Sequence, residues 1–91
     1  MANQLELASF KVSVGDIVYY QESAAGIVKA CVADGSGSLH VVVDVLQFMG
    51  KDTAHSDRWS LPRTQLEQWP AEELVQVRAW YIEDDCFVVI L

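Results

Sequence analysis

The side chains best suited to chemistry lie close together in one short polar stretch. Between Gly50 and Asp57 the sequence reads GKDTAHSD, which brings Asp52, His55 and Asp57 near one another. An imidazole beside two carboxylates is a set from which a general base or a metal site can be built. The Gly, Asp, Thr and Ser content is equally that of a polar loop, and the sequence has no GxSxG, HExxH, P-loop or GxGxxG motif. We therefore favour a loop here and expect no enzyme, no metal and no cofactor.

Aromatic side chains form the second group that could carry a function. The candidates are Tyr19, Tyr20, Trp59, Trp80 and Tyr81. Because side chains alternate along a strand, one member of each neighbouring pair must face away from the core. Outward aromatic rings with a carboxylate nearby can bind quaternary or methylated cations, whereas inward rings fill the core of a small domain. These residues predict a pocket for a small cationic or aromatic ligand, or for a peptide.

The size and composition of the chain fit one small domain. With 91 residues, positions 1–91 are expected to form a single domain. No apolar run approaches the ~18 residues that a membrane span needs, and the N-terminal residues do not resemble a secretory signal. Cys31 and Cys86 lie in apolar runs without metal-ligand spacing, so we expect two reduced thiols. These features predict a cytoplasmic protein.

The net charge of −7 limits the partners that the protein can have. Its six Lys and Arg residues are scattered along the chain, whereas nucleic-acid binders cluster basic residues to neutralise phosphates. The field of an acidic molecule also repels anionic lipid. We therefore expect no nucleic acid and no membrane as a partner, and charge favours a basic protein instead.

The apolar and β-branched stretches predict a chain of short strands. The expected strands are Asp16–Gln21, Ala25–Ala33, Leu39–Met49, Arg58–Leu61, Leu74–Ile82 and Cys86–Leu91. The links between them are short, so the pairing should be largely antiparallel.

The segment that follows Pro70 is the ambiguous part of the sequence. Proline followed by Ala71 and two glutamates favours a helical turn over Pro70–Glu73, since acids in a first turn suit the helix dipole. The alternation of Leu74–Ile82 then favours a strand. A longer helix, from Pro70 to about Trp80, is the alternative.

Two of the expected strands carry more apolar surface than one layer can hide. In Leu39–Met49 one face is purely apolar, while the opposite face still holds several large side chains. In CFVVIL, the end of the sequence, both faces are apolar, so this strand needs to be central in its sheet or covered by a second subunit. The residues expected to form an interface are Val42, Leu46, Phe48, Val88 and Ile90. A homo-oligomer, either a dimer or a dimer of dimers, is the expected assembly.

The run VGDIVYY…GIVKACVADGSGSLHVVVDVL resembles the start of SH3-like small barrels of the Tudor and KOW kind. The matching residues are Gly15 and Asp16 before the first strand and Gly26 in the second. The later WPAEELVQV resembles the short helical turn that precedes a final SH3 strand. The last hairpin, Leu74 to Leu91, extends beyond that pattern. In size, acidity and lack of motifs the chain also resembles orphan proteins of bacterial mobile gene cassettes (integrons).

The sequence therefore predicts a mostly β protein: a small antiparallel SH3-like barrel or bent sheet of five to six strands, with one short helical segment near Pro70. An α+β fold with a helix after Pro70 is the alternative. The leading function is a non-enzymatic interaction module that associates with itself. A small-ligand or peptide-binding module with an aromatic pocket is second, and an enzyme is least favoured.

Overall fold

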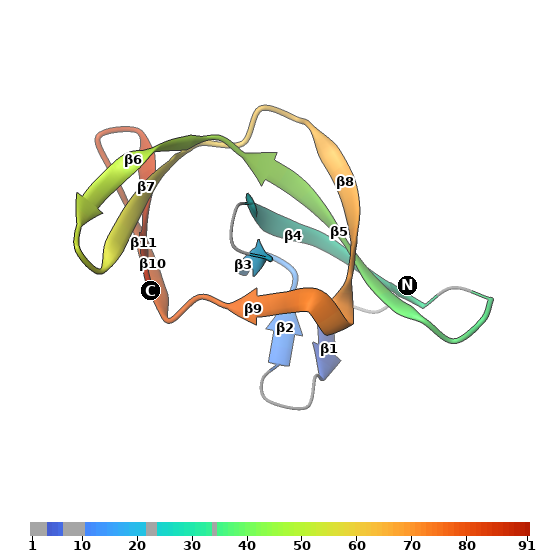
Figure 1. Cartoon of the computed structure of the whole chain (residues 1–91). Helices are drawn as coiled ribbons and strands as arrows, with labels where there is room; N and C mark the ends of the chain where they lie inside the picture. Colours follow the sequence, from blue (N-terminus) through green and yellow to red (C-terminus); the bar gives the residue numbers. More distant parts are fainter. Residues whose placement is uncertain (1–3, 7–10, 22–23, 34) are drawn as a thin grey trace.

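The computed structural model describes residues 4–6, 11–21, 24–33 and 35–91, so parts of the N-terminal stretch lie outside the description. The described residues form eleven strands in three antiparallel sheets and one 3-10 turn (Figure 1). Their bounds are β1 (Gln4–Glu6), β2 (Lys11–Ser13), β3 (Ile17–Tyr20), β4 (Ala24–Ala33), β5 (Leu39–Leu46), β6 (Phe48–Thr53), β7 (Ser56–Ser60), β8 (Leu66–Pro70), η1 (Ala71–Glu73), β9 (Leu74–Gln76), β10 (Ala79–Glu83) and β11 (Cys86–Ile90). The prediction of a mostly β fold is confirmed.

The largest sheet has five strands and curls into a half-barrel. Its strand order is β8-β5-β4-β3-β9, and Figure 1 shows the sheet bending so that its two edge strands approach at η1, which connects them. The predicted helical turn is confirmed as η1, directly after Pro70, whose φ of −67° suits the start of a turn. Among the described residues no helix is long and apolar enough to cross a membrane.

The second sheet has four strands in the order β10-β11-β7-β6. The chain passes into it at Gln47, where the expected single strand Leu39–Met49 divides into β5 and β6. The predicted loop over Gly50–Asp57 is wrong, because most of this stretch belongs to β6 and β7, which pair as a hairpin. Polar residues are tolerated in β6 because it is an edge strand whose side chains are mostly solvated. Ser56 and Asp57, at the start of β7, are buried.

The expected strand Leu74–Ile82 is also divided. It breaks at Val77 and Arg78, so that β9 pairs with β3 in the half-barrel while β10 pairs with β11 in the second sheet. The alternative of a long helix from Pro70 is therefore wrong. The structure adds the strand β8, which the sequence LEQWP does not predict; it is an edge strand that ends at its proline.

Apolar clusters cover both faces of the half-barrel, because alternate residues of β3, β4 and β5 point to opposite sides. The first cluster collects side chains from all five strands of the half-barrel. Its buried members are Val12, Val18, Val28, Cys31, Val41, Val43, Trp69, Ala71 and Leu74. The second cluster lies between the half-barrel and the second sheet, and its buried members are Ile17, Tyr19, Ala25, Leu46, Trp59, Val77, Phe87 and Val89. The cover that the apolar strands require is thus supplied largely within one chain.

The two cysteines are free thiols in different sheets. Cys31 is buried in β4, and Cys86 is half-buried in β11. Burial raises the pKa of the Cys31 thiol, and the charge of Asp16 raises it further, so this thiol is held in its unreactive protonated form.

Candidate functional site

The cluster Asp52–His55–Asp57 does not converge in the folded chain. Asp52 accepts a hydrogen bond from Nε of Arg58 at 2.8 Å, and His55 is exposed in the turn between β6 and β7. Asp57 is buried and accepts a hydrogen bond from the Tyr19 hydroxyl. No group of three or more His, Cys, Asp or Glu side chains suited to a metal ion is found in the described part of the chain.

Two of the aromatic candidates are joined in a buried hydrogen-bonded chain. Nε1 of Trp59 donates to the Tyr19 hydroxyl at 3.1 Å, and this hydroxyl donates to Oδ2 of Asp57 at 3.0 Å. The two rings meet edge to face, with their centroids 5.7 Å apart. Burial raises the pKa of Tyr19 to about 12, and the hydrogen bond and charge of Asp57 add to the rise while the Trp59 bond opposes it. Tyr19 and Trp59 therefore hold the second core together and are withdrawn from solvent.

The other three aromatic candidates take no part in these hydrogen bonds, and their rings do not gather at one place. Tyr20 is half-buried at the margin of the first core, where its ring centroid lies 5.2 Å from that of Trp69. Trp80 and Tyr81 are neighbours on β10 and so point to opposite faces of the second sheet. The five aromatic candidates therefore do not form one cage.

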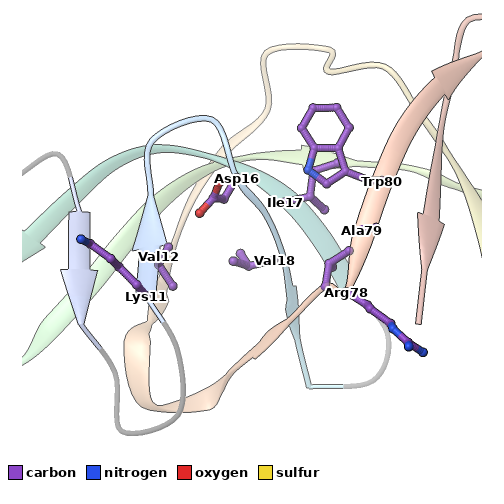
Figure 2. Close-up of a pocket in the computed structure, with 9 residues that line it drawn as sticks. Lys11, Val12, Asp16, Ile17, Val18, Arg78, Ala79 and Trp80 are labelled. Atoms are coloured by element: carbon purple, nitrogen blue, oxygen red, sulfur yellow. The ribbon is translucent and has the colours of Figure 1, made fainter.

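One open pocket of about 270 Å³ lies between β2, β3 and the start of β10. Its lining residues are Lys11, Val12, Asp16, Ile17, Val18, Val77, Arg78, Ala79 and Trp80. Figure 2 shows the charged ends of Lys11 and Arg78 extending away from the centre, on opposite sides. Asp16 accepts a hydrogen bond from the backbone N–H of Ser13 at 2.8 Å, and Trp80 is the one aromatic candidate in the lining.

The five residues expected to form an interface differ widely in exposure. Leu46 and Val88 are buried, at 4% and 0% exposed, and Val42 and Ile90 are half-buried. Phe48 remains 50% exposed on β6. The apolar strand β11 is central in its sheet, between β10 and β7, so it is protected by position within its own subunit.

An ion-paired arginine crosses the outer face of the second sheet above Val88. Val88 on β11 lies directly opposite Arg58 on β7. Nη2 of Arg58 donates to Oε1 of Glu83 on β10 at 2.8 Å, so the guanidinium reaches across β11. Its hydrogen bonds with Glu83 and Asp52 raise the pKa of Arg58, and the group stays charged. The aliphatic part of a long basic side chain can cover apolar surface in this way, and Val88 is fully buried within one chain.

Strand β10 carries a run of exposed apolar side chains. All five of its residues are exposed, including Trp80 at 39%, Tyr81 at 44% and Ile82 at 60%. It is the outer strand of the second sheet and pairs in continuous register with β11 alone. A regular and apolar edge strand is the feature through which one sheet adds a strand from another chain.

The other edges of the two larger sheets are protected in recognisable ways. Strand β6 has two shifts in register and carries Lys51, β8 ends in Pro70, and β9 has only three residues. Bulges, lysine, proline and short length all discourage pairing with another chain. Of these four edges, β10 is therefore the one that lacks such protection.

Comparison with protein-family models, with curated proteins and with solved structures finds no match to this chain. The architecture defines its class: a small all-β protein in which a curled half-barrel packs against a second antiparallel sheet.

Proposed function

We propose that the protein is a non-enzymatic interaction module that associates with itself by adding a strand at β10. The observation that carries this proposal is the unprotected edge Ala79–Glu83, which is exposed along its whole length. Ile82 there is, at 60%, the most exposed large apolar side chain of the described residues, and Tyr81 beside it is 44% exposed. An acidic chain stays soluble with such an edge, but burying the edge still gains free energy at about 25 cal/mol per Å² of apolar surface.

The backbone of β10 supports the same proposal. Asp84 and Asp85 have φ of 52° and 58°, which makes a two-residue turn between β10 and β11. In such a hairpin the closing pair, Glu83 and Cys86, is hydrogen-bonded, and hydrogen-bonded pairs then alternate along the strands. The N–H and C=O groups of Trp80 and Ile82 therefore face outward, ready to pair with another strand.

Replacing Ile82 by lysine tests this edge. A lysine at position 82 places a charge on the exposed edge without disturbing a buried side chain, so the folded subunit should persist while its association weakens. Leu66→Lys is the matched control, since Leu66 is 58% exposed on β8, another edge strand. Light scattering behind size exclusion, over a dilution series, measures the mass of each variant.

We expect a dimer for the unchanged protein and for Leu66→Lys, and a shift toward monomer for Ile82→Lys. A monomeric mass of the unchanged protein at every concentration would reject the proposal. Equal dissociation of both variants would show that the edge β10 has no special role.

The pocket at Trp80 favours binding of a small cationic or aromatic ligand as a second candidate function. Trp80 and the carboxylate of Asp16 line one cavity, and an aromatic face with a nearby carboxylate is a common setting for a methylated ammonium group. Titration with trimethyllysine, followed by tryptophan fluorescence, should then give saturable binding that Asp16→Asn weakens. Asparagine can still accept the Ser13 hydrogen bond, so the variant tests the charge alone. A fluorescence signal that does not change with ligand removes this candidate.

We also propose that the half-barrel belongs with the SH3-like barrels of the Tudor and KOW kind. Its support is the pairing of β3 with both β4 and β9, and the helical turn η1 between β8 and β9.

The acidity and small size of the chain support an origin among mobile gene cassettes. Two free thiols suit a reducing compartment, so we propose the cytoplasm as the location.

A further inference from the structure

We infer that the strand added at β10 is β10 of a second copy, running antiparallel about a two-fold axis at Tyr81. This inference rests on the proposed function and names the partner and the register. It follows from the distribution of charge along the edge, from the side chains that the register brings together and from the edges that remain afterwards.

Charge along the edge selects the antiparallel direction. Arg78 precedes β10, while Asp84 and Asp85 are exposed in the turn that follows it. Glu83 already accepts a hydrogen bond from Arg58, so the two aspartates supply the free negative charge of the turn. An antiparallel pair places Arg78 of each copy beside the acidic turn of the other. A parallel pair places acidic turn beside acidic turn, which two chains of net charge −7 would not favour.

Hydrogen bonding and side-chain contacts then select the register. The N–H and C=O groups of Trp80 and Ile82 point away from β11. They form hydrogen bonds across the axis only when each of these residues lies opposite a residue of the other copy whose backbone groups also point outward. With the axis at Tyr81, Trp80 of each copy faces Ile82 of the other. Both of these contacts lie on the side of the sheet that bears the second core. Tyr81 faces its own symmetry mate on the opposite side. Aromatic–aromatic and aromatic–β-branched pairs are the favourable cross-strand neighbours.

The edges left after this pairing explain why the assembly stops at two copies. Joining the four-stranded sheets of two copies through β10 makes one continuous eight-stranded sheet. Its remaining edges are the two β6 strands, which have shifted register and carry Lys51. A two-fold contact uses the same surface on both copies, so the dimer is closed and no further strand is added.

Charge reversal at the two ends of β10 tests the direction and the register. The variants are Arg78→Glu, the turn variant Asp84→Lys with Asp85→Gly, and the combination of all three changes. Glycine at the second turn position suits its φ of 58°, so the altered turn should still close the hairpin. Sedimentation equilibrium gives the dissociation constant of each dimer, and near-ultraviolet circular dichroism confirms that each variant is folded.

We expect Arg78→Glu and the turn variant each to weaken the dimer about tenfold, because each replaces two attractive contacts by repulsive ones. The combined variant should restore the dimer, and the differences should shrink at high salt. In a parallel pair, reversing one end leaves like charges facing like charges, so the single-end variants would bind as tightly as the unchanged protein. That result, or a combined variant no tighter than the single-end variants, would overturn the inferred register.

The outcomes separate this inference from the proposed function. If Ile82→Lys dissociates the dimer while charge reversal has no effect, the edge β10 is confirmed and the antiparallel register is rejected. If the unchanged protein is monomeric at all concentrations, both are rejected.

Discussion

Gly26→Ala is expected to lower the free energy of unfolding by about 3 kcal/mol, the upper part of the range for overpacking a core. A Cβ at Gly26 would lie 2.9 Å from Cβ of Val43, 3.0 Å from its Cγ2 and 3.1 Å from Cη2 of Trp69. Both neighbours are buried in the first core, so neither can move aside without disturbing its own packing. The cost is steric, since glycine at this position is needed for close approach between β4 and β5.

Urea unfolding of Gly26→Ala and of the control Gly35→Ala measures this difference. A Cβ at Gly35 meets no atom within 4 Å, so the control should change stability by less than about 0.5 kcal/mol. Adding Val43→Ala should not rescue Gly26→Ala, because the nearest atom is Cβ of Val43, which alanine retains. Equal stability of the two glycine variants would show that β4 and β5 are not packed as closely as the structure places them.

Tyr19→Phe is expected to cost about 2–4 kcal/mol, because it leaves two buried polar groups without their partner. Nε1 of Trp59 loses its acceptor, and Oδ2 of Asp57 loses its donor. Oδ1 of Asp57 already has no hydrogen-bond partner among the described residues, so the carboxylate would be buried with little compensation. The aromatic ring stays in place, so the loss reports on the hydroxyl and not on packing.

Asp57→Asn is the matched control for this prediction. The asparagine side chain still offers an oxygen to the Tyr19 hydroxyl and removes the buried charge, so its cost should be well below that of Tyr19→Phe. Denaturant unfolding at neutral pH gives both values. A loss for Tyr19→Phe no larger than that for Asp57→Asn would contradict the role given to the hydroxyl.

The same tyrosine makes stability depend on alkaline pH. Its folded pKa is raised from 10.0 to about 12, so the folded state keeps a proton that the unfolded state releases first. The stabilising contribution is therefore complete below pH 10 and is lost as the pH rises toward 12. Denaturant unfolding between these limits should show a decline in the unchanged protein that is smaller in Tyr19→Phe. An equal decline in both proteins would show that another group is responsible.

Local signals in the sequence were sufficient for the central part of the fold. Gly-Asp before Ile17, and the alternation that follows, predict the strands β3, β4 and β5 because each depends on nearby residues. Pro70 predicts η1 for the same reason. The break at Val77 and Arg78 was not predictable, because the alternation of apolar residues continues through it while the chain leaves one sheet and joins the other.

The candidate site was harder to predict because exposure depends on the order of strands. The sequence shows that CFVVIL needs cover, and it is covered because β7, distant in the chain, pairs with β11 on its far side. Nothing local indicates that Arg58 reaches Glu83 across that strand. Val88 is therefore buried, whereas β10 is exposed and includes Trp80 and Tyr81, which the sequence predicts as parts of a ligand pocket.

The backbone amides of β10 provide the most direct test of strand addition. Amide hydrogen exchange, measured residue by residue by NMR at high and at low protein concentration, separates the two sides of this strand. The N–H groups of Trp80 and Ile82 should be protected in concentrated protein and should lose protection on dilution. Those of Tyr81 and Glu83, which face β11, should stay protected at both concentrations. Fast exchange at Trp80 and Ile82 even in concentrated protein would contradict the proposal that β10 pairs with another strand.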